Sequence, residues 1–521
     1  MKSTKRLLAA LLAAIMILVA LPVAAMAEEE PLEITLMLSE QSLQPVLQDT
    51  VTIKFIEDKF NIHITLMPIP SSDFSTKLST VFATADLPDL IAGVAMNDIR
   101  NYDLGDMLVD LYDYRDCLPT YLGLIEADDR INATKTYEVT EEDGETSLYL
   151  MRDLEYNRID IAPIGAIRSD LLEELGLEMP TTWDEMYETM KAIKAAYPDV
   201  YFFSSRNGTN YMIGSLAYAM GSGGFGTFDT TRGMYYEKDS DSWVYGPTSA
   251  NFKNVIQFLA NAWQDGLIDP DYATNTRDVL WEKISTGKVV YFKDNNSFIA
   301  RVFQPAFEAA GNNWNLKIVP PLANNVTETR ELRYERDWSD GIVINKDCPE
   351  VERVLEMLDW CFSDEGVKVM NFGVEGETYY LDDDGNPMMV DSIMEETAGS
   401  TDQFNAIQSI LGVGCWCWTP YIDEGTYLQT SGSLFIDMGK EIRGYTEEGL
   451  IDFKALTPSF TTEENEQVAD LELKLDTVFS SNIDAFITGS RSMDEWDAFV
   501  ADLQNAGSAD LEELFNTAYK R

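Results

Sequence analysis

The stretch from residue 32 to residue 94 decides the fold, and it reads LEITLMLSEQSLQPVLQDTVTIKFIEDKFNIHITLMPIPSSDFSTKLSTVFATADLPDLIAGV. Short apolar segments of strand type follow one another here, and two longer segments with helical spacing separate them. This β-α-β-α-β order predicts a parallel sheet with helices on its faces. We expect strands at 32–38, 62–67 and 90–94, and helices within 46–60 and at 74–84.

A helix-start signal marks the next part of the chain. Thr182 and Glu185 have the spacing of a capping box, in which each side chain caps a backbone N–H at the helix start. Apolar residues follow at helical spacing as far as Ile193, and Pro198 lies beyond the helix end. Further helices are expected at 251–264, 350–361 and 494–503, and further strands at 287–292 and 316–320.

The chain has 521 residues, which is more than one hydrophobic core usually supports. It contains no internal repeat and no long low-complexity linker. We therefore expect two α/β lobes that are joined by short crossings rather than by a tether.

The first residues have the pattern of an export signal. Three basic residues precede the apolar run 7–19, and residues 25–27 form a small-x-small cleavage site. We expect residues 1–27 to be a cleaved signal peptide, so that the mature protein is secreted and extracytoplasmic. The first cysteine is Cys117, so the chain has no lipobox cysteine behind the apolar run.

Charge and histidine content exclude several classes of function. The formal net charge is −51, and such a surface repels nucleic acid and anionic lipid. The single histidine, His63, lies in an alternating strand segment, which excludes histidine-based triads and His-rich metal sites. The class of enzymes that use carboxylates for catalysis is not excluded by this composition. Five cysteines in so long a chain do not make a disulfide framework.

Several segments resemble the family of extracellular solute-binding proteins that includes the maltodextrin receptors, and in particular its longer branch. They occur in the family's order along nearly the whole chain after the export signal. The segments are LMLSE at 36–40, ATADLPDLI at 83–91, RSDLLEELG at 168–176, PTTWDE at 180–185, GLIDPD at 266–271, SDEG at 363–366 and GVEGETY at 373–379.

The resemblance implies a two-lobed, periplasmic-binding-protein-like α/β fold of the Venus flytrap type. Each lobe is expected to be a mixed, mostly parallel sheet flanked by helices, with the ligand cleft at the hinge. Lobe one takes residues 28–160 and 320–385, and lobe two takes residues 161–319 and 386–521.

Many members of the longer branch carry a calcium loop directly after the helix that begins Trp-Asp-Glu. Here that place reads AYPDVY at 196–201, with too few oxygen ligands, so we expect no metal there and no cofactor. The acidic run 382–387 has its glycine misplaced for a calcium loop and is expected to be a solvated hairpin tip.

A sugar ligand would need aromatic planes for its C–H faces and polar side chains for its hydroxyls, in a cleft that excludes water. The loop with Trp416, Trp418 and Tyr421 fits best, because Gly and Pro prevent a long helix there. Both tryptophans share one side of an extended segment. Trp338 lies where the chain should return to lobe one, near the hinge. Burial in lobe packing is the alternative for each of them.

Four more candidates lie in the expected second lobe. By resemblance to the maltodextrin branch, Tyr211 falls at a sugar-contacting aromatic ahead of a glycine-rich stretch, which we expect to let backbone approach the ligand. Asp294, Asn295 and Phe298 follow a strand, at another expected ligand loop.

Glu40 and Asp89 are expected to end strands of lobe one, where open α/β sheets bind ligands, although an ordinary surface contact is equally compatible. Together these features predict a non-catalytic, monomeric receptor that captures an oligosaccharide and delivers it to the transmembrane subunits of an ABC permease. A secreted glycoside hydrolase with paired carboxylates is the main alternative. A peptide-binding receptor on the same fold is the second.

Overall fold

The stretch 32–94 forms three neighbouring strands of one sheet in the computed structural model, so its predicted strand–helix alternation is confirmed. β1 pairs in parallel with β2 on one side and with β3 on the other, while β14 returns antiparallel to β3. The order of the strands is β2-β1-β3-β14-β6. They span β1 Leu32–Glu40, β2 Ile62–Pro70, β3 Leu90–Ala95, β6 Met151–Arg152 and β14 Asp340–Ile344.

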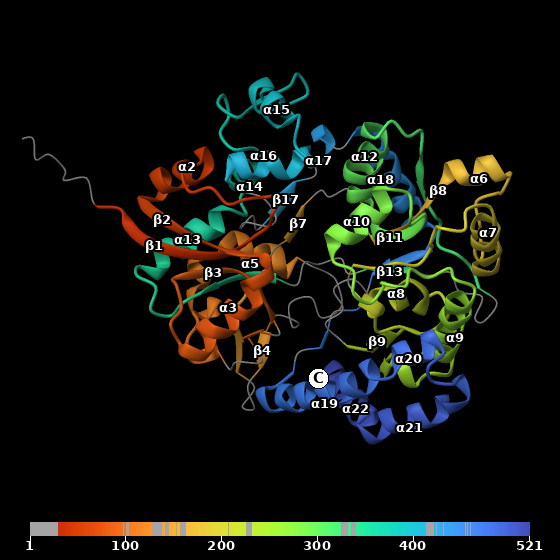
Figure 1. Ribbon diagram of the computed structural model, residues 1–521. Coiled ribbons are helices and arrows are strands. Elements are labelled where there is room, and N and C mark those ends of the chain that lie inside the picture. Colours follow the sequence, from red (N-terminus) through yellow and green to blue (C-terminus); the bar gives the residue numbers. More distant parts are fainter. Residues whose placement is uncertain are drawn as a thin grey trace, which may run out of the picture.

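Two lobes lie side by side in Figure 1, the first around this sheet with α2, α3, α5 and α13, and the second around β8 and β11 with α6 to α10.

The structure describes residues 30–96, 98–99, 104–127, 138–140, 145–152, 154–156, 163–206, 208–225, 232–324, 332–334, 340–412, 421–423, 425–430, 432–453, 455, 457–458 and 460–521.

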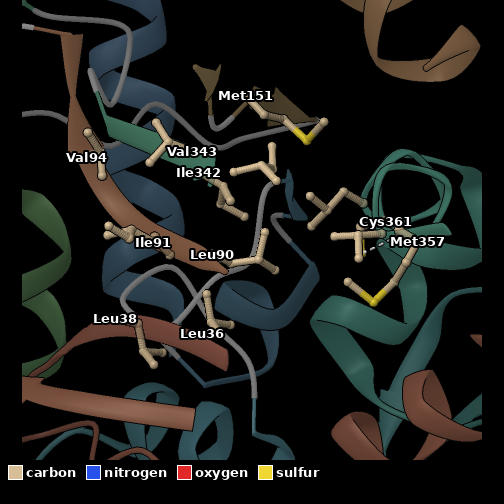
Figure 2. Close-up of a cluster of buried hydrophobic side chains, with 14 of the residues drawn as sticks. Leu36, Leu38, Leu90, Ile91, Val94, Met151, Ile342, Val343, Met357 and Cys361 are labelled. Carbon is tan, nitrogen blue, oxygen red and sulfur yellow. Dashed lines mark hydrogen bonds between the residues drawn. The ribbon is translucent and has the colours of Figure 1, made fainter. Parts of the chain in front are cut away.

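The helices of the first lobe begin and end at local signals. The Thr50 hydroxyl accepts a hydrogen bond from the backbone N–H of Ile53 at the start of α2, and Asn61 takes the left-handed conformation at its end. In Figure 2, side chains of β1, β3 and β14 meet Met357 of α13 and Cys361, which directly follows that helix, in one buried cluster. Each fully buried large apolar side chain there contributes about 1.5–3 kcal/mol. The helices are α2 Val51–Phe60, α3 Ser71–Thr84, α5 Pro119–Glu126, α13 Val351–Trp360 and α14 Asp364–Phe372.

The second lobe has a smaller sheet, in which β8 lies between β11 and β12. Both pairings are antiparallel, whereas we predicted a mostly parallel sheet in each lobe. Ile164 and Ala166 of β8 face one apolar core and Ile167 faces another, because successive strand residues point to opposite sides. The sheet therefore separates two cores of the same lobe. Its strands are β8 Pro163–Arg168, β11 Tyr291–Asn295 and β12 Leu316–Ile318.

The predicted capping box is confirmed at the start of α7, where the Thr182 hydroxyl and the Glu185 carboxylate each accept a backbone N–H. Such a cap contributes about 1 kcal/mol. The helices of this lobe are α6 Ser169–Leu175, α7 Trp183–Ala196, α8 Gly208–Ala217, α9 Ala250–Gln264, α10 Arg277–Ser285, α11 Asn296–Phe298, the π-helix η5 Ile299–Phe303, α12 Gln304–Ala309, α18 Gly432–Glu447, α19 Thr462–Ser480, α20 Ile483–Thr488, α21 Trp496–Asn505 and α22 Ser508–Lys520.

One helix, α16, contacts both lobes. Phe404 near its start packs in a core of the second lobe, whereas Ile407 and Leu411 near its end pack in the core of the first. Met389 also lies in the first core, although we expected residues after 385 in lobe two. Leu322 packs in the second lobe, although we expected residues from 320 in lobe one. These contacts favour a second segment of lobe one that extends from β14 to the end of α16.

The remaining elements are short. They are α15 Asp391–Thr397, α16 Gln403–Leu411, α17 Gly425–Thr430, the parallel pairs β7 Leu154–Tyr156 with β17 Tyr421–Asp423 and β13 Leu332–Tyr334 with β18 Ile451–Phe453, the antiparallel pairs β4 Glu138–Thr140 with β5 Thr146–Leu148, β9 Met234–Glu237 with β10 Ser242–Tyr245 and β15 Tyr379–Leu381 with β16 Pro387–Met389, and 3₁₀ turns at Leu104–Asp106, Leu111–Cys117, Gly246–Thr248 and Met493–Glu495.

The acidic run 382–387 is a hairpin turn between β15 and β16, as predicted. The Asp382 carboxylate accepts hydrogen bonds from the backbone N–H groups of Asp384 and Asn386, which closes the turn. Within the residues described above, no group of three or more His, Cys, Asp or Glu side chains is arranged to hold a metal ion. Over the same residues, no helix is long and apolar enough to cross a membrane.

Candidate ligand-binding site

A polar cluster lies where β11 ends, and it is built around Asp294. This carboxylate is fully buried, and its two oxygens accept hydrogen bonds from Nε and Nη2 of Arg206 at 3.1 and 3.0 Å. Burial works against the charge of Arg206, but the pairing with Asp294 outweighs it and the pKa of the guanidinium is raised. The backbone N–H of Asn295 donates to the same carboxylate at 2.8 Å. Asp294 is therefore held in one orientation, and Arg206 is fixed beside it.

An aromatic surface adjoins this ion pair. The ring of Phe298, at the end of α11, lies 5.1 Å from the ring of Trp281, and the two planes are inclined by 57°. The guanidinium carbon of Arg206 lies 5.7 Å from the centroid of Phe298. Phe298 and Trp281 are both half-buried. A partly exposed apolar ring beside fixed hydrogen-bonding groups is the combination that recognition of a sugar requires.

Tyr211 belongs to the same region, but its ring is not presented to solvent. It lies on α8 and is 2% exposed, and the ammonium of Lys293 lies 5.5 Å from the ring centroid. In this conformation Tyr211 is buried and contacts Lys293, the neighbour of Asp294 in β11. Its predicted contact with a sugar stays a prediction.

The glycine-rich stretch after Tyr211 has a structural explanation that differs from our expectation. Gly224 has φ of +88°, and a Cβ atom there would lie 2.1 Å from the carbonyl oxygen of Gly233. A Cβ atom on Gly246 would lie 2.3 Å from the carbonyl oxygen of Gly223. At these positions the glycines allow backbone to pack against backbone near the β9–β10 hairpin.

The two candidates of the first lobe occupy different edges of its sheet. Glu40 ends β1 as predicted, and its carboxylate accepts a hydrogen bond from the backbone N–H of Val46 in the following loop. Asp89 precedes β3, so the expectation that it ends a strand is wrong. Its carboxylate accepts from the backbone N–H and the hydroxyl of Thr35, both at 2.7 Å. Asp89, in the Pro-Asp segment that resembles the family, therefore links the start of β3 to β1 at the end of the sheet opposite to Glu40.

The tryptophan candidates Trp338, Trp416 and Trp418 lie outside the described residues. Tyr421 begins β17, whose backbone pairs in parallel with β7 between the lobes. Their predicted contacts with a ligand stay predictions.

Sequence reasoning missed Arg206, Trp281 and Lys293, which surround the predicted residues Asp294 and Phe298. Two local signals were available. Lys293 and Asp294 interrupt an otherwise apolar strand, and buried charges are rare unless they are paired. Arg206 lies in a polar loop directly after an apolar segment. No local signal separates Trp281 from an ordinary core residue of an amphipathic helix.

The structure thus has two α/β lobes, and the second carries a polar and aromatic cluster at the end of β11. The chain matches the family described as bacterial extracellular solute-binding protein over residues 39–368, which is more than half of its length, and it belongs to that family.

Three known proteins illustrate the similarity. Lipoprotein LipO of Bacillus subtilis (strain 168) is 24% identical over 347 residues, which cover 64% of this chain and 64% of LipO. The fructooligosaccharide ABC transporter substrate-binding protein FusA of Streptococcus pneumoniae is 21% identical over 506 residues, which cover 89% of this chain and 85% of FusA.

The solved structure of FusA in complex with kestose superimposes with a TM-score of 0.71 at 17% identity and covers 94% of this chain and 99% of that one. The alginate-binding protein AlgQ2, solved without calcium ion, gives a TM-score of 0.76 at 17% identity, with 95% and 99% covered. These superpositions confirm the predicted two-lobed solute-binding fold.

Proposed function

We propose that this chain captures an oligosaccharide between its lobes and delivers it to the transmembrane subunits of an ABC permease. The observation that carries the proposal is the cluster of Arg206, Asp294 and Phe298 at the end of β11, with Trp281 beside it. Membership of the solute-binding family supports it, as do the ligands after which FusA and AlgQ2 are named, a fructooligosaccharide and alginate.

A thermal-shift screen tests this function directly. Kestose, alginate oligosaccharides and a wider glycan panel are compared with a peptide library, each added to the purified chain. A ligand at 100 times its Kd adds about 2.7 kcal/mol to the stability of the folded state, which is easily detected. We expect at least one glycan to raise the melting temperature. A chain that responds to peptides and to no glycan would be a peptide-binding receptor instead.

The site itself is tested by Phe298→Ala, with Tyr380→Ala as a matched control. Tyr380 is an aromatic residue of the first lobe that is 48% exposed on the β15–β16 hairpin. Loss of a partly buried ring from the site is expected to weaken glycan binding about tenfold or more in calorimetry. The control variant is expected to bind as the wild type does. Equal affinity of the two variants would remove Phe298 from the site.

We also propose that the protein binds its ligand without altering it. The same glycan, incubated with the chain for a day and analysed by mass spectrometry, is expected to be recovered intact. Hydrolysed product would favour a glycoside hydrolase with paired carboxylates over a receptor.

Export completes the proposal. We propose that residues 1–27 are removed and that the mature, monomeric chain begins at Glu28. The N-terminal sequence and intact mass of the exported protein test the cleavage site, and an N-terminus upstream of Glu28 would contradict the proposal.

A further inference from the structure

A cavity that is separate from the cluster at the end of β11 lies between the two lobes, and we call it the α16 cavity. Its volume is about 700 Å³, within the range of about 300–1,000 Å³ that small-molecule sites have. The second lobe supplies η5, α12, β12 and the start of α18, and the first supplies the α15–α16 loop and the start of α16. In Figure 1, α12 and α18 lie on one side of this cavity and α16 on the other. None of Arg206, Asp294, Phe298 and Trp281 lines it, so it is not part of that cluster.

Hydroxyl and amide groups line the α16 cavity. They belong to Gln304, Asn315, Ser400, Thr401, Gln403 and Ser433. No aromatic side chain is among its lining residues in the part of the chain that the structure describes. A sugar site needs an apolar ring for the C–H faces of its ligand, so the lining indicates a ligand of another kind.

Two opposite charges lie in the wall of the α16 cavity. Glu308 belongs to α12 and Lys317 to β12, and both are exposed. The Glu308 carboxylate accepts a hydrogen bond from Nε2 of Gln304 at 3.4 Å. Within the described residues, neither Glu308 nor Lys317 takes part in an ion pair. A molecule with one ammonium and one carboxylate group would pair with both through charge-assisted hydrogen bonds.

The wall also contains Arg301, which connects the cavity to both lobes. Its Nη1 donates to the Asp402 carboxylate of the first lobe at 3.1 Å, and its Nε donates to the carbonyl oxygen of Ser297 at 3.3 Å. Because η5 follows Phe298 directly, one helical run carries both Phe298 and a wall of the α16 cavity. Single π-helical turns are frequent at functional sites. A molecule in this cavity would therefore contact both lobes and the helix that presents Phe298.

We propose that the α16 cavity is a regulatory site for a small zwitterion, an amino acid or a short peptide, held between Lys317 and Glu308. The cavity exists in the arrangement of the lobes in which Arg277 contacts Ser42, so an occupant that touches both lobes stabilises this arrangement. A glycan held between the lobes favours the same arrangement. Each of the two ligands is therefore expected to raise the affinity for the other by the same factor. The coupling rests on the proposed function, whereas the binding of the zwitterion does not.

Calorimetric titration of the purified chain tests the binding. The probes are alanine, dialanine, trialanine and tetraalanine, each with its N-acetylated and C-amidated form. We expect at least one zwitterion to bind, and we expect blocking of either terminus to weaken its binding about tenfold or more. The length that binds most tightly distinguishes an amino acid from a peptide as the occupant.

Variants of the wall test where the zwitterion binds. Lys317→Gln and Glu308→Gln are each expected to weaken its binding about tenfold. Ser433→Trp places a large ring in the cavity and is expected to abolish binding. The matched controls Lys440→Gln and Glu395→Gln remove exposed charges of α18 and α15 and are expected to bind as the wild type does. All five changes lie at exposed positions, and an unchanged melting temperature shows that each variant is folded.

The coupling is tested with the glycan of the thermal-shift panel that stabilises the chain most. Its Kd is expected to fall about fivefold or more when the tightest zwitterion is present at a saturating concentration. The Ser433→Trp variant is expected to show no such response to the zwitterion. A glycan Kd that stays the same or rises would overturn the regulatory role.

The remaining failures are distinct. If no zwitterion binds while a glycan does, the α16 cavity is not a site and the proposed function stands. If zwitterion binding is lost in Phe298→Ala and kept in Lys317→Gln, the zwitterion binds at the cluster of β11 and the α16 cavity is again not a site. If no glycan of the panel binds, the proposed function is wrong, and the zwitterion titrations still decide whether the cavity binds.

Discussion

Two arginines of the second lobe connect it to the first, and they do so in opposite ways. Arg301 of η5 pairs with Asp402 at 3.1 Å, and the exposed fractions of the two side chains are 7% and 0%. Arg277 of α10 donates to the uncharged, exposed hydroxyl of Ser42. The first contact is a buried ion pair, and the second is a single hydrogen bond at the surface.

Burial decides what each contact can do. Asp402 caps α16 by accepting the backbone N–H of Asn405, and α16 packs in both lobes. Breaking this ion pair would leave a buried charge without its partner. We therefore expect the pair to remain formed whenever the chain is folded. The Arg277–Ser42 hydrogen bond exchanges with water at almost no cost. From this difference we expect the Arg301 contact to lie at the hinge and the Arg277 contact to break when the lobes open.

Asp402→Ala is expected to have the largest effect, because it removes the cap of α16 and leaves Arg301 buried without a carboxylate. We expect a loss of about 3–5 kcal/mol in the free energy of unfolding, measured by urea denaturation. Asp402→Asn keeps the cap and is expected to lose less. A loss under about 1 kcal/mol for Asp402→Ala would show that the pair does not hold the hinge.

Lys283→Met tests whether a buried ion pair inside one lobe behaves differently from one at the hinge. The ammonium of Lys283 donates to both oxygens of Asp269 at 2.9 and 2.8 Å and to the side-chain oxygen of Asn275 at 3.0 Å. Removal of the ammonium leaves the buried Asp269 carboxylate without a positive charge beside it. We therefore expect a loss of about 3 kcal/mol in the free energy of unfolding. The distance between labels placed in the two lobes is expected to stay unchanged, whereas Asp402→Ala is expected to alter it.

The pH dependence of stability is a second test of the pair between Lys283 and Asp269. Burial raises the pKa of Asp269, but hydrogen bonds from Lys283, Asn275 and Ser204 outweigh it, and the pKa is lowered. The carboxylate therefore stabilises the fold above its unfolded pKa of about 3.9, and this contribution is lost as the pH falls through the lower folded value. The unfolding free-energy difference between wild type and Asp269→Asn is expected to be constant near neutral pH and to shrink below about pH 4. A difference that does not change between pH 6 and 3 would contradict the pairing.

The elements that sequence reasoning predicted well are those with local causes. The strands and helices of 32–94 and the Thr182–Glu185 capping box depend on residues that are near one another in the chain. Asp89 was wrongly expected to end a strand, although the strand predicted at 90–94 already begins after it; in the structure it precedes β3 and contacts Thr35 of β1.

The binding cluster depends on contacts that no local pattern contains. Arg206, Trp281 and Asp294 come from three separate elements, and their meeting depends on how β11 pairs with β8 and on where α10 packs. The antiparallel second sheet was missed for the same reason. Half of the candidate cluster, Asp294, Asn295 and Phe298, was still found because it lies at the end of a strand. The expectation that these residues follow the strand in a loop is wrong, since Asp294 and Asn295 are the last residues of β11 and Phe298 belongs to α11.

Arg277→Met is expected to have the smallest effect on stability and is the sharpest test of the comparison. An exposed hydrogen bond contributes little, so the free energy of unfolding is expected to change by less than about 0.5 kcal/mol. The distribution of distances between one spin label in each lobe is nevertheless expected to shift toward longer distances. Pulsed electron paramagnetic resonance measures this distribution. Glu282→Gln, an exposed change on the same helix, serves as the control and is expected to leave the distribution as in the wild type. An unchanged distribution for Arg277→Met would place the closing contact elsewhere, and the two arginines would then differ only in burial and not in function.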